Sequence, residues 1–129
     1  VVTGANTGLG FEVAKTLAGK GARVLLGCRS LSKAQAAKDR ILGIFPKADV
    51  VIVELDLGSL VSIQKAAQQI NQELRLDILI NNAGIMVPPL EYTQDGFESQ
   101  FGVNHLGPFV LTSLLLDKIR ATTNARIVS

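Results

Sequence analysis

The chain has 129 residues, of which 47% are hydrophobic, 19% charged and 5% aromatic. Thirteen Lys and Arg residues against eleven Asp and Glu leave a net charge of +2, too small for a protein held to nucleic acid by phosphate neutralisation. The mean hydropathy of +0.32 is high, yet no apolar run approaches about 18 residues, so we expect no membrane span. One cysteine and one histidine exclude an internal disulfide and leave no ligand set for a metal site.

Short aliphatic runs alternate with longer segments of helical periodicity along the chain. We predict strands at 1–2, 23–26, 50–55, 78–80 and 126–128. Four helices should lie between them, with Ser32 opening the second and Ser59 capping the third. Their predicted apolar stripes are Leu9, Val13 and Leu17; Ala34, Ala37, Ile41 and Phe45; Ile63, Ala66, Ile70 and Leu74; and Phe97, Phe101, Leu111, Leu115 and Ile119.

Strand–helix alternation of this kind is typical of βαβ units in a parallel sheet, whose right-handed crossovers place helices on both faces. We predict a single α/β domain over residues 1–129, with a doubly wound parallel sheet of the Rossmann-like type and five strands in the order 3-2-1-4-5. Both ends of the chain are apolar strand segments. We therefore expect a domain that is incomplete at both ends, with an open edge at its last strand.

A glycine-rich turn, Thr3 to Gly10 (TGANTGLG), joins the first strand to the first helix. Glycines permit positive φ and close approach of a ligand, and a helix N-terminus offers free N–H groups to a pyrophosphate. The spacing is G-x-x-x-G-x-G rather than G-x-G-x-x-G, and no Lys-Ser/Thr follows as in a P-loop. A turn that needs glycine for sterics alone is the alternative. Its place between a strand and a helix favours a dinucleotide site.

The second strand ends at Cys28 and Arg29, about 20 residues past the glycines, where the ribose 2′ position of a dinucleotide falls. An acid there would accept a hydrogen bond from the 2′-hydroxyl of NAD, but positions 27–32 contain none. Arg29 offers a bidentate donor to a phosphate. Residues 1–48 also hold eight Lys and Arg against two acids. We therefore predict NADP(H) as the cofactor, with Arg29 at its 2′-phosphate.

Five motifs together resemble those of the short-chain dehydrogenase/reductase family, in its retinol-dehydrogenase-like branch. Spread in order along the whole chain, they are Thr3–Gly10, Cys28-Arg29, Asp56-Leu57, Asn81-Asn82-Ala83-Gly84 and Val103-Asn104-His105-Leu106-Gly107. The resemblance implies the cofactor-binding part of an NADP(H)-dependent oxidoreductase that interconverts an alcohol and a carbonyl on a hydrophobic substrate. In such enzymes the cofactor carries the hydride.

The resemblance also implies roles for particular residues. Asp56 and Leu57 would meet the adenine ring, although Asp56 is alternatively an acid stabilised at the start of the next helix. Asn81 would tie neighbouring strands together. The implied cofactor-binding residues are Gly4, Asn6, Thr7, Gly8, Leu9, Gly10, Arg29, Asp56, Leu57, Asn82, Ala83 and Gly84.

Asn104 lies three residues after Phe101 and seven before Leu111, which places it on the apolar face of the fourth predicted helix. Pro108, four residues on, has no N–H to offer the Asn104 carbonyl, so we predict a kink and an unsatisfied carbonyl on a buried face. In the resembled family the matching asparagine holds a water of the proton relay, which makes Asn104 the expected catalytic residue. The alternative is a structural asparagine bonded to a neighbouring strand.

The tyrosine and lysine of the family's catalytic Tyr-x-x-x-Lys segment have no counterpart here, because the only tyrosine, Tyr92, is followed four residues on by Gly96. Ser129 matches a position ahead of the family's catalytic serine. We expect the chain by itself to be inactive and to be an excerpt of a longer enzyme. A non-catalytic dinucleotide-binding module or a truncated inactive product is the alternative.

Expectations about partners follow from the same analysis. We expect a small-molecule substrate, no nucleic acid and no membrane contact by this segment. We also expect a homo-oligomer for the longer enzyme, and a cytoplasmic location.

Overall fold

A computed structural model describes all 129 residues. One sheet of five parallel strands has the order β3-β2-β1-β4-β5, so the predicted fold class and strand order are confirmed. Each strand lies within two residues of its predicted bounds. The strands are β1 (Val2–Thr3), β2 (Val24–Cys28), β3 (Val50–Glu54), β4 (Ile78–Ile80) and β5 (Arg126–Val128).

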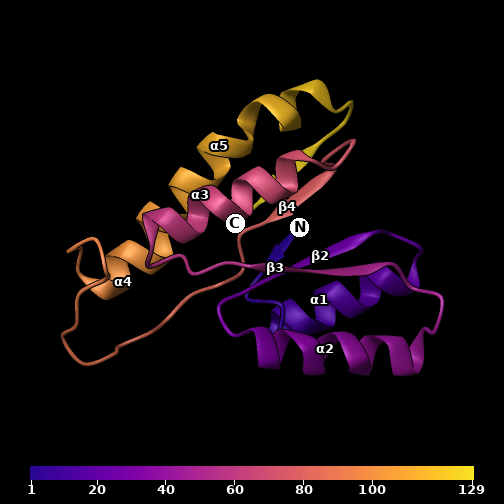
Figure 1. Cartoon of the computed structure of the whole chain (residues 1–129), viewed down its shortest axis with the longest axis horizontal. Helices are drawn as coiled ribbons and strands as arrows, with labels where there is room; N and C mark the ends of the chain where they lie inside the picture. Colours follow the sequence, from indigo (N-terminus) through magenta and orange to yellow (C-terminus); the bar gives the residue numbers. More distant parts are fainter.

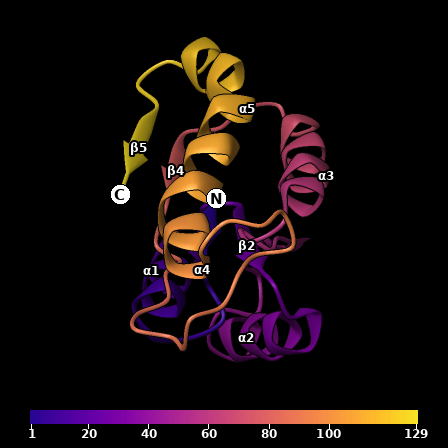
Figure 2. The same cartoon turned by 90° about the vertical axis from the view of Figure 1, so that its left-hand side faces the viewer.

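Helices cover both faces of this sheet. Figure 1 shows α1 and α2 below the sheet and α3 and α5 above it. Figure 2, turned by 90°, places β5 at the outer edge beside β4. The helical segments are α1 (Gly8–Gly19), α2 (Leu31–Ile44), α3 (Leu60–Asn71), the short α4 (Ser99–Phe101), the π-helical segment η1 (Gly102–Leu106) and α5 (Gly107–Ala121).

Each face of the sheet has its own apolar core. All five residues of β2 are buried, and their side chains alternate between the faces. Leu25 joins the cluster under α3 and α5, whereas Val24, Leu26 and Cys28 join the cluster over α1 and α2. A strand buried on both faces reads as a continuous apolar run and so contributes to the high mean hydropathy.

Serine side chains cap the second and third long helices. The Ser59 hydroxyl accepts from the Ser62 N–H at 3.3 Å, so the predicted cap of α3 is confirmed. The prediction of Ser32 for α2 is wrong, because the Ser30 hydroxyl accepts from the Lys33 N–H at 3.4 Å. The helix therefore begins at Leu31, directly after Ser30, and Ser32 lies within its first turn.

Two leucines predicted on buried helix faces are exposed. Leu9 is 79% exposed, and α1 packs through Phe11, Ala14 and Ala18 instead. The two alanines let the helix approach the sheet closely, while Leu9 lies at the open start of the helix. Leu74 is completely exposed because α3 has already ended at Asn71.

The fourth predicted helix is broken into three segments. The Gly107 N–H bonds to the Gly102 carbonyl, five residues back, so η1 is wider than an α-helix and shifts the faces on either side of it. Phe97 precedes the helix and Phe101 is 52% exposed, contrary to the prediction. The C-terminal part of the predicted apolar stripe is buried as expected, at Leu111, Leu115 and Ile119.

Pro108 lies in the first turn of α5, immediately after η1. A proline in this position has no N–H to complete the preceding turn. The chain accommodates it by widening the helix into a π turn, in place of the simple kink that we predicted.

The last strand leaves one edge of the sheet open. β5 pairs with β4 alone, and Ile127 and Val128 are 44% and 48% exposed. The predicted open edge is therefore found. No helix combines the length and the hydropathy needed to cross a bilayer.

Candidate functional site

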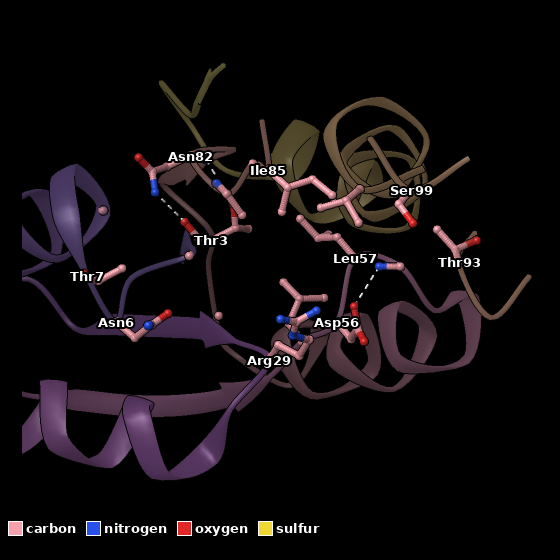
Figure 3. Close-up of a pocket in the computed structure, with 18 of the residues that line it drawn as sticks. Thr3, Asn6, Thr7, Arg29, Asp56, Leu57, Asn82, Ile85, Thr93 and Ser99 are labelled. Carbon is pink, nitrogen blue, oxygen red and sulfur yellow. Dashed lines mark hydrogen bonds between the residues drawn. The ribbon is translucent and has the colours of Figure 1, made fainter. Parts of the chain in front are cut away.

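The carboxyl ends of the first four strands surround a pocket of about 640 Å³. Figure 3 shows its side chains converging from the glycine turn, from the ends of β2 and β3 and from the segment after β4. A crevice at this edge of an open parallel sheet is where such folds bind ligands. Eleven of the twelve residues predicted to bind the cofactor line it, namely Gly4, Asn6, Thr7, Leu9, Gly10, Arg29, Asp56, Leu57, Asn82, Ala83 and Gly84. Gly8 and Asn104 do not.

The three glycines of the turn serve different purposes. Gly4 and Gly8 have φ of +67° and +56°, in the left-handed region that favours glycine. Gly10 is required by space, because a Cβ there would lie 2.3 Å from the Asn82 side-chain nitrogen and 2.6 Å from the Gly4 carbonyl oxygen. The glycine at position 10 thus lets α1 pack directly on the end of β1.

No side chain caps the N-terminus of α1. Thr7 occupies the N-cap position in an extended conformation, but its side chain makes no capping hydrogen bond. The first N–H groups of the helix are therefore left without a side-chain partner, and Thr7, Leu9 and Gly10 line the pocket. The helix macrodipole makes this position favourable for an anion.

Thr3 joins the glycine turn to the segment after β4, a role that the sequence did not indicate. Its buried hydroxyl accepts from the N–H groups of Asn82 and Ala83, both at 3.0 Å. The Asn82 side-chain amide donates back to the Thr3 carbonyl at 2.9 Å. Figure 3 shows Thr3 and Asn82 linked in this way at one side of the pocket. A polar residue in the short central strand was the only available signal.

Arg29 is the only basic residue that lines the pocket. It is exposed and makes no hydrogen bond or ion pair with the protein, and no acidic residue at the end of β2 competes with it. Cys28, just before it, is buried, and burial raises the pKa of its thiol. The end of β2 thus presents a free guanidinium and an inert thiol.

Asp56 lies at the end of β3 in a tight turn. Its Oδ1 accepts from the Gly58 N–H at 2.8 Å, while its own N–H donates to the Ser62 hydroxyl at 2.9 Å. The Oδ2 atom has no hydrogen-bond partner. The carboxylate therefore holds the turn before α3 with one oxygen and leaves the other available on the pocket side.

Asn104 is exposed, so the prediction that it lies on a buried face is wrong. The π turn of η1 directs its side chain to the segment after β4 rather than to the core. Its Oδ1 accepts from the Ile85 N–H at 2.8 Å and its Nδ2 donates to the Ile85 carbonyl at 2.7 Å. A Cβ on Gly84 would also lie 3.4 Å from Oδ1. Asn104 thus fixes the path of the chain just beyond Ala83.

Replacing Asn104 with alanine should release this segment. Both hydrogen bonds to Ile85 are lost, so we expect faster amide hydrogen exchange at Ile85, by about tenfold, with little change at the buried strands. Hydrogen exchange read by NMR measures this directly. Gln64→Ala, at an exposed side chain of α3 that makes no hydrogen bond, is the matched control. Unchanged exchange at Ile85 would contradict the assigned role.

Asn81 ties the sheet together, as predicted. Its backbone N–H bonds to the Val128 carbonyl at 2.8 Å, and its side-chain amide donates to the hydroxyls of Thr112 and Ser129. Its buried Oδ1 has no hydrogen-bond partner.

No group of three or more His, Cys, Asp or Glu side chains is arranged to hold a metal ion.

The parallel sheet, the uncapped helix start after a glycine turn and the pocket at the strand ends together define a nucleotide-binding domain of the Rossmann-like type. The comparisons with known proteins specify the family. The sequence model described as short chain dehydrogenase matches residues 1–129, so the chain belongs to the short-chain dehydrogenase family of oxidoreductases.

Three similar proteins illustrate this membership. The whole chain is 52% identical to human retinol dehydrogenase 13 and covers 39% of that protein. It is 46% identical, again over its whole length, to mouse retinol dehydrogenase 12 and covers 41% of that protein. It thus spans about two fifths of the curated relatives it matches. A metagenomic short-chain oxidoreductase solved in complex with NADP superposes with a TM-score of 0.83 at 26% identity, covering 98% of this chain and 57% of that one.

Proposed function

We propose that these residues form the cofactor-binding part of an NADP(H)-dependent oxidoreductase that interconverts an alcohol and a carbonyl. One observation carries the proposal: the uncapped start of α1 and the unpaired Arg29 lie in the same pocket. The first suits a pyrophosphate and the second suits a 2′-phosphate. The NADP bound to the metagenomic oxidoreductase of similar fold supports the same assignment.

The pocket residues fit such a cofactor, which would supply the hydride when bound. The free Oδ2 of Asp56 suits the exocyclic amine of adenine, and the buried Leu57 offers an apolar contact beside it. The turn from Asn82 to Gly84, held by Thr3, would lie along the ribose and the phosphate bridge. Gly8 would act indirectly, because its positive φ of +56° lets the backbone of the turn follow its path.

Asn104 is proposed to take part in proton relay through a water on its backbone carbonyl. The position of Asn104 at the π turn, beside Gly84, supports this role. Binding of the cofactor, rather than turnover, is the activity assigned to these residues, because the sole tyrosine, Tyr92, has no lysine four residues on.

A hydrophobic substrate is the second part of the proposal. The segment after Ile85 exposes Met86, Val87 and Leu90 by 77–88%. Gln100 holds it in place, because its Oε1 accepts from the N–H of Val87, whose φ is +48°. Exposed apolar side chains on a fixed segment beside a pocket are typical of a binding surface.

Arg29→Asp should reverse the preference between the two nicotinamide cofactors. The substitution removes the donor to the 2′-phosphate and adds a charge that repels it, so we expect about tenfold to hundredfold weaker binding of NADPH and no loss of NADH binding. Isothermal titration calorimetry with each cofactor measures the change. Lys65→Asp, an equal charge change on an exposed face of α3, should leave both affinities unchanged. An unaltered preference in Arg29→Asp would contradict NADP(H) as the cofactor.

A further inference from the structure

The segment from Glu91 to Glu98, here called the 91–98 hairpin, folds back on itself just before α4. An antiparallel bridge joins Tyr92 to Glu98, and the Thr93 N–H bonds to the Phe97 carbonyl at 2.7 Å. Gly96 makes the turn with φ of +82°. The hairpin is therefore a defined element and not a loose connection.

Hydrogen bonds at two points fix the 91–98 hairpin to its neighbours. The Asp95 carboxylate accepts from the Leu60 N–H at 2.8 Å, at the first residue of α3. The Glu98 carboxylate accepts from the N–H groups of Gln100 and Phe101, which lowers the pKa of Glu98. The hairpin is thus held between the helix that follows Asp56 and the helix that leads into η1.

This attachment places the hairpin beside the Asp56 turn. A Cβ on Gly58 would lie 3.6 Å from the Thr93 methyl and 3.3 Å from the Asp56 Oδ1. A Cβ on Gly102 would lie 2.6 Å from the same methyl, so Thr93 packs between these two glycines. Figure 3 shows Thr93 on the side of the pocket where Leu57 and Asp56 lie.

Tyr92 is the large side chain that the hairpin contributes to the pocket lining. Tyr92 is 66% exposed, and its hydroxyl makes no hydrogen bond. Neither the core nor a polar network therefore accounts for an aromatic residue at this position. An exposed tyrosine ring on a hairpin whose backbone is held at two points offers a flat apolar face to a ligand in the pocket.

We propose that Tyr92 contacts the adenine base of the dinucleotide with the face of its ring, so that the 91–98 hairpin closes the adenine end of the pocket beside the Asp56 turn. The inference rests on the proposed cofactor-binding function. Base–aromatic stacking tolerates any base, so Tyr92 contributes affinity while Asp56 contributes the choice of adenine.

The chain itself provides the probe for this contact. Tyr92 is its only tyrosine and there is no tryptophan, so the intrinsic ultraviolet emission reports on one ring. We expect 2′,5′-ADP, the adenine half of NADP, to quench this emission with the affinity measured by calorimetry. Nicotinamide mononucleotide, the other half, should leave the emission unchanged.

Variants at position 92 complete the test. Tyr92→Ala should weaken 2′,5′-ADP binding about tenfold, whereas Tyr92→Phe, which keeps the ring, should bind within about twofold of the wild type. Phe97→Ala removes an aromatic residue of the same hairpin that does not line the pocket, and it should also bind normally. Circular dichroism checks that each variant is folded.

Two results would overturn the role of Tyr92 while leaving the proposed function intact. One is calorimetric binding of 2′,5′-ADP without any change in tyrosine emission. The other is equal affinity in Tyr92→Ala and the wild type. Failure of the wild type to bind 2′,5′-ADP in the calorimeter would instead contradict the proposed function, and the role of Tyr92 with it.

Discussion

Gly10→Ala is expected to abolish measurable dinucleotide binding and to lower the free energy of unfolding by about 2 kcal/mol. The new Cβ would lie 2.6 Å from the backbone oxygen of Gly4 and 2.3 Å from the side chain of Asn82, so α1 must move away from the end of β1. That movement displaces the N–H groups proposed to bind the pyrophosphate. Urea denaturation and calorimetry with NADPH measure the two effects separately.

Gly43→Ala is the matched control for this experiment. Gly43 lies on the exposed side of α2, and a Cβ there would have no neighbour within 4 Å. The same substitution should therefore stabilise the protein by about 0.5–1 kcal/mol and leave NADPH binding unchanged. Equal effects of the two substitutions would show that close packing of Gly10 against the Gly4 backbone is not required for stability or binding.

Thr3→Val should lower the free energy of unfolding even more than Gly10→Ala, although it preserves the shape of the side chain. It removes the hydroxyl that accepts from the N–H groups of Asn82 and Ala83 and leaves both without that partner beneath the pocket. Each donor left unsatisfied costs about 1–3 kcal/mol, and these two are partly buried, so we expect a loss of about 3 kcal/mol in the free energy of unfolding. Urea denaturation measures it, and 2′,5′-ADP binding should weaken in parallel.

Thr3→Ser separates the hydroxyl from the methyl group. The serine keeps the acceptor and loses one methyl, so it should cost only about 1 kcal/mol and retain binding. A valine variant as stable as the serine variant would mean that the two N–H groups find other partners and that Thr3 does not organise the turn after β4.

The outline of the site was predictable from the sequence for a simple geometric reason. Parallel strands end at one edge of a sheet, so residues that directly follow β1, β2, β3 and β4 must approach one another. The glycine turn, Arg29, Asp56 and the Asn82–Gly84 turn each begin within two residues of a strand end, and each contributes residues to the pocket lining. Because these residues lie so close to the strand ends, their positions in the fold follow from the positions of the strands.

Features that depend on contacts between distant segments were not predictable in this way. Thr3 and Asn82 are 79 residues apart, and nothing in either local sequence indicates their pairing. The 91–98 hairpin depends on a bond from Asp95 to the start of α3, 35 residues earlier. An α-helical period predicts the wrong face for Asn104, because the segment Gly102–Leu106 is π-helical.

The bonding of the central strand has a consequence for the order in which the protein folds. β1 is followed closely in the chain by its partner β2, but its other partner, β4, is synthesised more than seventy residues later. Contacts of such long range form slowly, because the loop must close before they contribute any stability. A nascent chain that has reached α3 therefore has the glycine turn but no fixed partner for Thr3. The nucleotide pocket is thus one of the last parts of this fold to form.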